Sequence, residues 1–390
     1  MLFDFNQEKL KEIKAFHTVN EIKQQPATWK KTVRIIEEHK QELDAFMTDF
    51  MSHPKHRIIF SGAGTSEFVG NSLIDVLRRR YDFMIDSVAT TLIVSNPDLY
   101  LEKDTPTLLI SFGRSGNSPE SIGAVNHAEA IVDDLYHLVV TCNANGQLAQ
   151  FKSDKSKIFA INLPEETHDQ SFAMTSSYSN MVLAAYLALT LDKFEENKQL
   201  VNELVRLADN YFAKEVQTVN EIVSTFDFER IVYLGSNNYK GFAQESALKM
   251  LELTTGEVAS LFDSSLGFRH GPKSFLNDNT LVVLYTSQSE YTFRYDKDLF
   301  DEISGNKLAK VLVVTTEQHK DHFKDADYVI AHDTLVGDDL LGLVYVLVAQ
   351  SFSVLKSLQL NKTPDNPFPS GIVNRVVQGV TLYDYEGESK

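Results

Sequence analysis

The chain has 390 residues, of which 43% are hydrophobic and 23% charged, and its formal net charge is −17 at pH 7. This composition is typical of a globular protein of about two domains that can bury large cores. The negative charge argues against a nucleic-acid or anionic-membrane partner, because no basic field offsets the long-range repulsion by phosphate.

The chain begins with a helical segment. Its first residues, MLFDFNQEKLKEIKAF, are charged and amphipathic and lack the apolar core of a secretory signal, so we expect a cytoplasmic protein. Residues 21–51 have a helical pattern with Pro26 near the start, where a helix tolerates proline. We therefore predict an N-terminal helical segment over residues 1–45.

Two copies of one pattern follow. RIIFSG at 57–62 returns as RIVYLG at 230–235, and TLLISFGRS at 107–115 returns as TLVVLYTSQ at 280–288. Both pairs have the same offset, because 230 minus 57 equals 280 minus 107. LVVT at 138–141 recurs at 312–315, where the offset is larger by one. Self-similarity in this order and spacing indicates a duplicated domain.

Each copy contains five β-branched or aromatic runs, which we expect to be strands. They lie near 57–61, 84–94, 107–112, 136–141 and 157–162, and then near 230–235, 257–262, 280–286, 310–315 and 327–332. Their continuous apolar character indicates parallel strands covered on both faces, and helical patterns lie between them. The predicted fold is α/β, with two tandem three-layer α/β/α sandwiches, each containing a five-stranded parallel sheet.

The predicted limits are 46–200 for the first sandwich, 201–370 for the second and 371–390 for a C-terminal tail. Cys142, the single cysteine, excludes an intrachain disulfide or a Cys-based metal cluster, and we expect it to serve packing. The longest apolar stretch, at 340–355, falls short of a membrane-spanning helix and carries Gln350, so we interpret it as a buried helix.

The loop SFGRSGNSPES, at 111–121, follows the third strand and precedes a helix that should begin near Pro119. Gly113 and Gly116 would let backbone N–H groups approach an anion at the helix N-terminus. The side chains that add donors are those of Ser115, Asn117 and Ser118. Taken alone, such a loop is more often a serine-rich helix cap with glycines for the turn.

A second loop, SGAGTSEF, follows the neighbouring first strand and also combines glycines with hydroxyl groups. Gly62 and Gly64 precede Thr65 and Ser66 there. Two such loops at one sheet edge suit a phosphate group. The second copy has YTSQSEYTF at the place of the 111–121 loop, without glycine, so we predict that its sheet has lost the phosphate site and that the fold does not require the loop's composition.

The second copy carries charged residues of a different kind. Residues 239–257 form a predicted helix ended by Gly256, with Glu245, Lys249 and Glu252 on one face. An exposed row of ion pairs is the usual explanation of such spacing. The rest of this helix is apolar almost all round, however, which indicates burial. Charged residues on a buried helix are expected either to pair with other charges or to have a function.

A glycine-bounded loop, SSLGFRHGPKSF, comes next and contains Arg269, His270 and Lys273. A single histidine is more often structural than catalytic. In such a loop it can also act as an acid or base near neutral pH.

Six motifs in this order resemble the tandem sugar-isomerase (SIS) domain proteins. They are EIKQQP (21–26), GAGTS (62–66), GRSGNS (113–118), QESALKMLE (244–252), FRHGP (268–272) and NPFPSGIVNRVVQGVT (366–381). Over nearly its whole length the chain is similar to the isomerase half of glucosamine-6-phosphate synthase. It most resembles the bacterial galactosamine-6-phosphate deaminase/isomerases, also described as tagatose-6-phosphate ketose/aldose isomerases.

The resemblance implies roles for particular residues. Glu252 would move a proton between C1 and C2 of the sugar, with Lys249 as its electrostatic partner, and His270 would assist ring opening. The 6-phosphate would be held by Thr65, Ser66, Arg114, Ser115 and Ser118, with Gly64 and Asn117 in the same loops. In the synthase the counterpart of His270 comes from the neighbouring subunit, so we expect a homodimer or a larger homo-oligomer.

Three further positions are candidates with a weaker basis. Thr175 and Ser176, in ETHDQSFAMTSSYSN, would line the sugar pocket, although helix capping explains much of this stretch. Gln378 stands where the synthase has a lysine, which argues against an imine formed with the enzyme. The chain also lacks the synthase's glutaminase domain, so glutamine-dependent synthesis is not expected.

The predicted reaction converts D-galactosamine 6-phosphate to tagatose 6-phosphate and ammonia, without a metal or other cofactor. One alternative is plain aldose/ketose isomerisation of a hexose 6-phosphate, which needs the same base and the same ring opener. The other is a non-catalytic phosphosugar-binding regulator, which would need neither the charged row nor His270. The N-terminal helices are too acidic and short for a DNA reader, which disfavours that second alternative.

Overall fold

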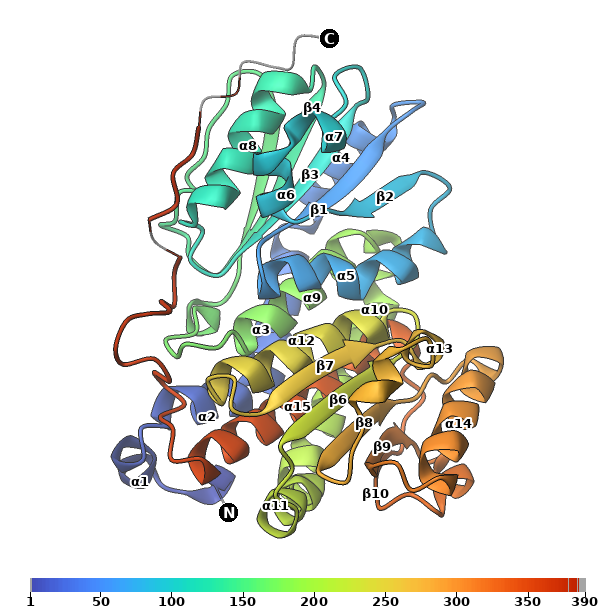
Figure 1. The fold of residues 1–390 in the computed structure, drawn as a ribbon. Coiled ribbons are helices and arrows are strands. Elements are labelled where there is room, and N and C mark those ends of the chain that lie inside the picture. Colours follow the sequence, from blue (N-terminus) through green and yellow to red (C-terminus); the bar gives the residue numbers. More distant parts are fainter. Residues whose placement is uncertain (1, 378, 384, 386–390) are drawn as a thin grey trace. The chain divides into compact units, whose positions relative to one another are not determined.

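The computed structural model describes residues 2–377, 379–383 and 385. It contains two five-stranded sheets, with strand orders β2-β1-β3-β4-β5 and β10-β9-β8-β6-β7. Every strand pair is parallel, and both copies arrange their five strands in the same topology when the second order is followed from β7 to β10. Helices flank both sheets (Figure 1). The predicted pair of α/β/α sandwiches is confirmed.

The duplication extends to the pairing register. β1 (Arg57–Ser61) pairs with β3 (Thr107–Gly113) so that Arg57 lies opposite Thr107. β6 (Arg230–Gly235) pairs with β8 (Thr280–Tyr285) so that Arg230 lies opposite Thr280. Because 230 minus 57 and 280 minus 107 both give 173, residues in these strands and just after them can be compared directly at that offset, which we call the strand offset.

The chain forms two compact units. The first-sheet unit consists of Ala27–Asp169, Ser176–Lys198 and Ser370–Lys390, and the second-sheet unit of Met1–Pro26, Gln170–Thr175 and Gln199–Pro369. The N-terminal residues therefore group with the second sheet, and the C-terminal tail groups with the first.

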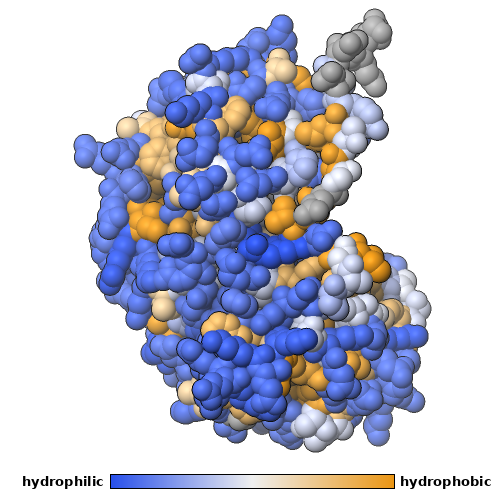
Figure 2. Space-filling model, turned by 90° about the vertical axis from the view of Figure 1, so that its left-hand side faces the viewer, coloured by the Kyte–Doolittle hydropathy of each residue, from blue (hydrophilic) through white to orange (hydrophobic). Residues whose placement is uncertain are grey.

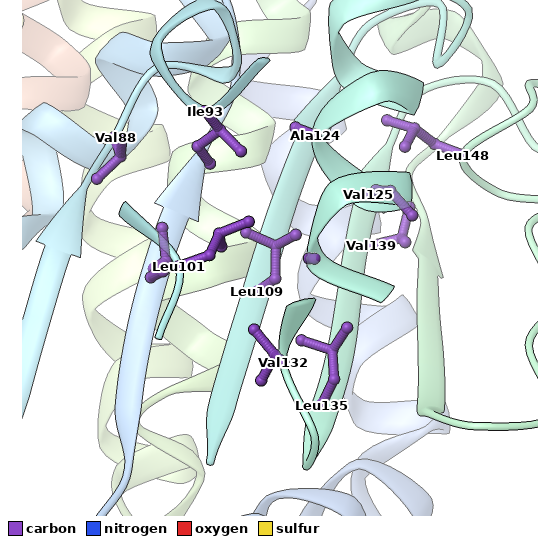
Figure 3. Close-up of a cluster of buried hydrophobic side chains, with 12 residues drawn as sticks. Val88, Ile93, Leu101, Leu109, Ala124, Val125, Val132, Leu135, Val139 and Leu148 are labelled. Carbon is purple, nitrogen blue, oxygen red and sulfur yellow. The ribbon is translucent and has the colours of Figure 1, made fainter. Parts of the chain in front are cut away.

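The first-sheet unit has helices on both faces of its sheet. The remaining strands are β2 (Met84–Ser87), β4 (Leu135–Thr141) and β5 (Lys157–Asn162), and the helices are α3 (Gln25–Glu38), α4 (Lys40–Met51), α5 (Thr65–Arg78), α6 (Thr90–Ser95), α7 (Pro97–Tyr100), α8 (Pro119–Ile131) and α9 (Ser176–Ala188). On one face, Leu109 and Val139 of the sheet pack against Ile93 of α6 and Val125 of α8 (Figure 3). Successive strand residues point to opposite faces, so Phe60, next to Ile59 of this cluster, faces α5 instead.

The second-sheet unit repeats this plan. Its remaining strands are β7 (Ala259–Asp263), β9 (Lys310–Thr316) and β10 (Tyr328–His332), and its helices are α1 (Gln7–Glu12), α2 (Phe16–Lys23), α11 (Val216–Thr225), α12 (Tyr239–Leu253), α13 (Ser265–Phe268), α14 (Glu290–Gly305) and α15 (Asp338–Gln359). α10 (Phe194–Asn210) leads into this unit from the first. Phe293 and Phe300 of α14 pack against Val282 and Val313 on one face, and Tyr285 contacts α12 and α15 on the other through Ser246 and Tyr345.

The sequence expectations were wrong in detail at several boundaries. Only Met84–Ser87 of the predicted 84–94 strand is β-structure, and its second half forms α6, whose Ile93 is buried in the core of Figure 3. The expected 257–262 strand lies at Ala259–Asp263. The helical stretch 21–51 is divided among α2, α3 and α4, with breaks at Gln24 and His39.

Two predictions about buried residues are confirmed. The apolar stretch at 340–355 lies in the buried helix α15, as expected. The expectation that it is too short to span a membrane is wrong, because among the described residues α15 is the one helix long and apolar enough to do so, and its most apolar window is entirely buried inside the protein. Cys142 is buried as a free thiol, and burial raises its pKa to about 12. The face of the molecule in Figure 2 is mostly hydrophilic with scattered hydrophobic patches, which fits the strongly charged composition.

Candidate active site

The predicted phosphate loops leave the same edge of the first sheet. Ser61 at the end of β1 lies opposite Ser111 in β3, and the strands are parallel. The loop after β1 leads directly into α5 and the loop after β3 leads into α8, so two helix N-termini follow neighbouring strands. The dipole of each helix favours an anion at this place.

Comparison with the second copy separates the glycines that the fold needs from those that it does not. Gly62 is retained as Gly235, and a Cβ on either would lie within 2.6 Å of the first turn of the following helix. Gly64 has φ +55°, and Asn237 keeps the same φ at the matching position. Both of these positions therefore serve the strand-to-helix turn.

Gly116 belongs to the first copy alone. It has φ +65°, in the left-handed region that favours glycine, and its carbonyl accepts a hydrogen bond from Leu148 N–H. The strand offset would match Ser118, the N-cap of α8, with Tyr291, but α14 already has its N-cap at Ser289. The first loop is therefore longer than the second, and the shared fold does not require its composition.

The hydroxyl and amide groups of the loop have different surroundings. Ser118 occupies the N-cap position of α8, but its side chain forms no capping hydrogen bond there. Helix capping therefore does not explain the serine at this position. Ser115 Oγ accepts a hydrogen bond from Asn117 N–H at 3.2 Å. Asn117 Oδ1 accepts one from Gln147 N–H at 2.9 Å, so this amide also fixes the neighbouring loop.

Arg114 is buried and belongs to a network that sequence reasoning missed. Its Nη2 donates to the carbonyl oxygen of Arg375 at 2.7 Å, and the Arg375 guanidinium donates to the carbonyl oxygen of Asp169. All three residues belong to the first-sheet unit. The network joins the phosphate loop, the C-terminal tail and the β5–α9 loop. The tail motif that contains Arg375 was the one available signal for it.

The group that caps the start of α9 is Asp169 and not Ser176. The Asp169 carboxylate accepts hydrogen bonds from Ser177 N–H at 2.9 Å, from the Ser177 hydroxyl at 2.6 Å and from the Ser176 hydroxyl. Thr175, the preceding residue, is buried. Gln378 lies outside the described residues, so its predicted place in the site stays an expectation.

The charged row of the second copy is a buried triad on α12. The side chains of Glu245 and Lys249 are 0% exposed and that of Glu252 is 23% exposed. Lys249 Nζ lies 3.4 Å from Glu245 Oε1 and 2.6 Å from Glu252 Oε2. An exposed row of ion pairs is therefore the wrong explanation. The ammonium group sits between two carboxylates, of which only that of Glu252 reaches solvent.

The FRHGP residues form a turn between α13 and a short 3-10 helix at Pro272–Phe275. Arg269 and Lys273 both pair with Glu302 on α14, and the Lys273 ammonium, aided by Arg269, lowers the pKa of that carboxyl group. His270 is exposed, and its side chain forms no hydrogen bond to any part of the chain that the structure describes. The turn thus presents a free imidazole while its two basic neighbours are engaged.

The predicted site residues thus form two groups. The phosphate-loop residues and Ser176 belong to the first-sheet unit, whereas Thr175, Lys249, Glu252 and His270 belong to the second-sheet unit. Among residues 2–377, 379–383 and 385, no cluster of three or more His, Cys, Asp or Glu side chains has a geometry that could hold a metal ion.

This fold, with loops suited to a phosphate on one copy and a buried acid–base triad on the other, is that of a sugar-phosphate enzyme with two SIS domains. Residues 51–191 and 226–358 both match the SIS domain, so the chain belongs to the SIS domain family. The two matches fall on the two copies of the duplicated unit.

Similar proteins are known within this family. The chain is 41% identical, over 97% of its length and 94% of the relative, to the D-galactosamine-6-phosphate deaminase AgaS of Shewanella sp. (strain ANA-3). The chain is 36% identical in sequence to tagatose-6-phosphate ketose/aldose isomerase from Escherichia coli. The crystal structure of that protein matches this one with a TM-score of 0.87, over 95% of this chain and 97% of that one. A proposed isomerase of the same kind from Clostridium novyi NT is 42% identical with a TM-score of 0.94, over 99% of both chains.

Proposed function

We propose that the protein converts D-galactosamine 6-phosphate and water to tagatose 6-phosphate and ammonia. The observation that carries the proposal is the α12 triad, in which a buried ammonium group holds one partly exposed carboxylate, that of Glu252. Support also comes from full-length relatives described as galactosamine-6-phosphate deaminases and as tagatose-6-phosphate isomerases. Both descriptions fit one reaction, because the deaminated product is the ketose.

The phosphate group of the substrate binds where β1 and β3 end. Backbone N–H groups at the starts of α5 and α8 bind its oxygens, and the hydroxyl groups of Ser66, Ser115 and Ser118 add further donors. The other residues of this proposed site are Gly64, Thr65, Arg114 and Asn117. The sequence prediction that Thr175, Ser176 and Gln378 contact the sugar remains part of this proposal.

Glu252 carries the proton transfer. After ring opening, its carboxylate removes the proton from C2 of the open-chain aldehyde, which leaves an enolamine, and the same carboxyl group returns the proton to C1. Lys249 orients this carboxylate and places positive charge beside the oxygen on which negative charge develops. Water then adds to the C2 imine, and its collapse releases ammonia and leaves the C2 ketone.

His270 opens the sugar ring by transferring a proton between the anomeric hydroxyl and the ring oxygen. Its exposure on a turn suits a group that serves a neighbouring subunit, and we propose a homo-oligomer of at least two chains with a shared active site. The reaction requires no metal or other cofactor, since an enolamine needs only a base and nearby positive charge. We further propose SIS domains at 46–200 and 201–370 and a cytoplasmic location.

The test incubates purified protein with galactosamine 6-phosphate, glucosamine 6-phosphate and neutral hexose 6-phosphates, and measures ammonia and ketose separately. Galactosamine 6-phosphate should yield equal amounts of ammonia and tagatose 6-phosphate. Ketose formed from a neutral aldose phosphate without any ammonia from the amino sugars would identify a plain isomerase. Binding without turnover of any substrate would identify a regulator.

A further inference from the structure

The edge of the second sheet that corresponds to the phosphate site is filled by two carboxylates. Asp296 of α14 is fully buried and accepts hydrogen bonds from Ser236 Oγ at 2.7 Å, from Ser287 N–H at 3.0 Å and from Ser265 Oγ. Asp338, the first residue of α15, accepts hydrogen bonds from Gln288 N–H at 2.9 Å, from Tyr239 Oη at 3.0 Å and from Ser287 Oγ. Six donors thus converge on two carboxylate groups.

Four of the six donor groups belong to counterparts of predicted phosphate-binding positions, whereas Ser236 and Ser265 match Ala63 and Leu92 at the strand offset. The strand offset relates Ser287 to Arg114, Gln288 to Ser115 and Tyr239 to Ser66. The donors are of the kind that binds phosphate elsewhere, namely backbone N–H groups of a loop between a strand and a helix, and hydroxyl groups. The second copy therefore has hydrogen-bond donors at three of the matching positions, carried by different residues.

The acceptors, in contrast, have no acidic counterpart in the first copy. The position on α8 that matches Asp296 is Gly123 by the strand offset, or Val125 when it is counted from the helix cap. Asp338 begins α15 where Ser176 begins α9. Neither acid therefore stands at its matching position in the first copy, where the buried Asp169 carboxylate accepts hydrogen bonds at the start of α9 instead.

Asp296 ionises in the same pH range as a phosphate ester. Burial, with a contribution from the nearby Asp338 charge, raises the pKa of Asp296 to about 6. A phosphate monoester likewise loses its second proton near pH 6.

We propose that the second SIS domain retains an oxyanion site and that the carboxylates of Asp338 and Asp296 are its built-in occupants. The chain then binds one sugar phosphate, on the first sheet, although it contains two copies of the fold. Removal of the Asp338 carboxylate frees the Gln288 N–H, the Tyr239 hydroxyl and the Ser287 hydroxyl for an external oxyanion such as inorganic phosphate. This inference rests on the proposed phosphate site of the first sheet but not on the proposed reaction.

The test compares the thermal unfolding of the wild type and of Asp338→Ala in phosphate and in chloride of equal ionic strength. Asp338→Ala should unfold at a lower temperature in chloride, because buried donors lose their acceptor. Phosphate at about ten times its dissociation constant should raise the midpoint of the variant by about 3 °C more than that of the wild type. The response of the first-sheet site is common to both proteins and cancels.

Asp339→Ala is the matched control, since it removes a carboxylate from the same first turn of α15. It should respond to phosphate as the wild type does, and an equal response of all three proteins would overturn the proposal. If Asp338→Ala is insoluble in chloride, phosphate should restore its soluble yield. Insolubility in both buffers, together with a soluble Asp338→Asn that shows no additional response to phosphate, would also overturn the proposal.

Discussion

Glu252 is the residue on which the chemistry depends. It is the one carboxylate of the α12 triad that reaches solvent, and its Oε2 is held 2.6 Å from the Lys249 ammonium group. An amide of the same shape keeps the hydrogen bond but cannot accept a proton from carbon.

Glu252→Gln should lower ammonia release from galactosamine 6-phosphate by at least about 100-fold while leaving the binding of the sugar phosphate intact. Ammonia assays and calorimetric titration with tagatose 6-phosphate measure the two effects separately. Glu257→Gln makes the same change just beyond the end of α12, at an exposed position, and should leave turnover unchanged. Wild-type turnover in Glu252→Gln would assign the proton transfer to another group.

At the residue scale, sequence reasoning identified side chains that lie close together in the chain. Glu245, Lys249 and Glu252 share a helix face, so their spacing alone brings them together, and the apolar remainder of the helix indicated their burial. The hydrogen bonds among Arg114, Arg375 and Asp169 join distant parts of the chain, and their acceptors are backbone carbonyl groups. A pattern of side chains in the sequence therefore could not predict them. Asp296 and Asp338 were not predicted as a cluster because their donors, such as Ser236 and Tyr239, lie far from them in the chain.

At the scale of single elements, α12 shows the difference between a buried and an exposed ion pair. Lys249 lies between two carboxylates with no exposed side-chain surface, whereas Lys240 in the first turn pairs with Asp263 and is half exposed. Removing one partner of a buried pair leaves an uncompensated buried charge, but removing an exposed charge costs little because water replaces it.

Lys249→Met should therefore lower the free energy of unfolding by about 3 kcal/mol or more and should abolish turnover. Lys240→Met should lower it by at most about 1 kcal/mol and retain activity. Urea denaturation of both variants checks the comparison. Similar losses for the two substitutions would show that the Lys249 ammonium group is not buried among charges.

Strands and helices could be predicted from the sequence wherever the pattern of apolar residues fitted only one kind of element. The continuous apolar runs at β1, β3, β4, β6 and β8 were predicted to within a residue or two of their limits. The helix α6 after β2 was not predicted, because Thr90–Ser95 contains β-branched residues that favour a strand. In the structure this segment is helical, and its Ile93 packs in the core. The break between α3 and α4 at His39 has no proline or glycine to mark it.

At the scale of the whole molecule, the duplication could be predicted because similar segments recur in the sequence at a nearly constant offset. The two sheets share topology and register, as that repeat implies. The composition of the two units could not be predicted. The N-terminal segment up to Pro26 joins the second-sheet unit through contacts such as those of Asp365 with the backbone of Thr18 and of Gln25 with Gln350. Contacts between such distant parts of the chain leave no period in the sequence.

The proposed shared active site has a consequence for mixed oligomers. Glu252→Gln and His270→Asn should each be inactive alone, because each lacks one group of the reaction. If the two residues of one site come from different subunits, refolding an equal mixture of the variants should restore up to about a quarter of the wild-type activity in a dimer. Absence of any recovery would place both residues of a site in the same chain.

The most direct measurement of the central claim follows wild-type turnover of galactosamine 6-phosphate in deuterium oxide by NMR. The account predicts equal amounts of ammonia and tagatose 6-phosphate, with deuterium at C1 of the ketose, since the proton held by Glu252 exchanges with solvent before its return. Tagatose 6-phosphate without deuterium at C1, or no turnover at all, would contradict it.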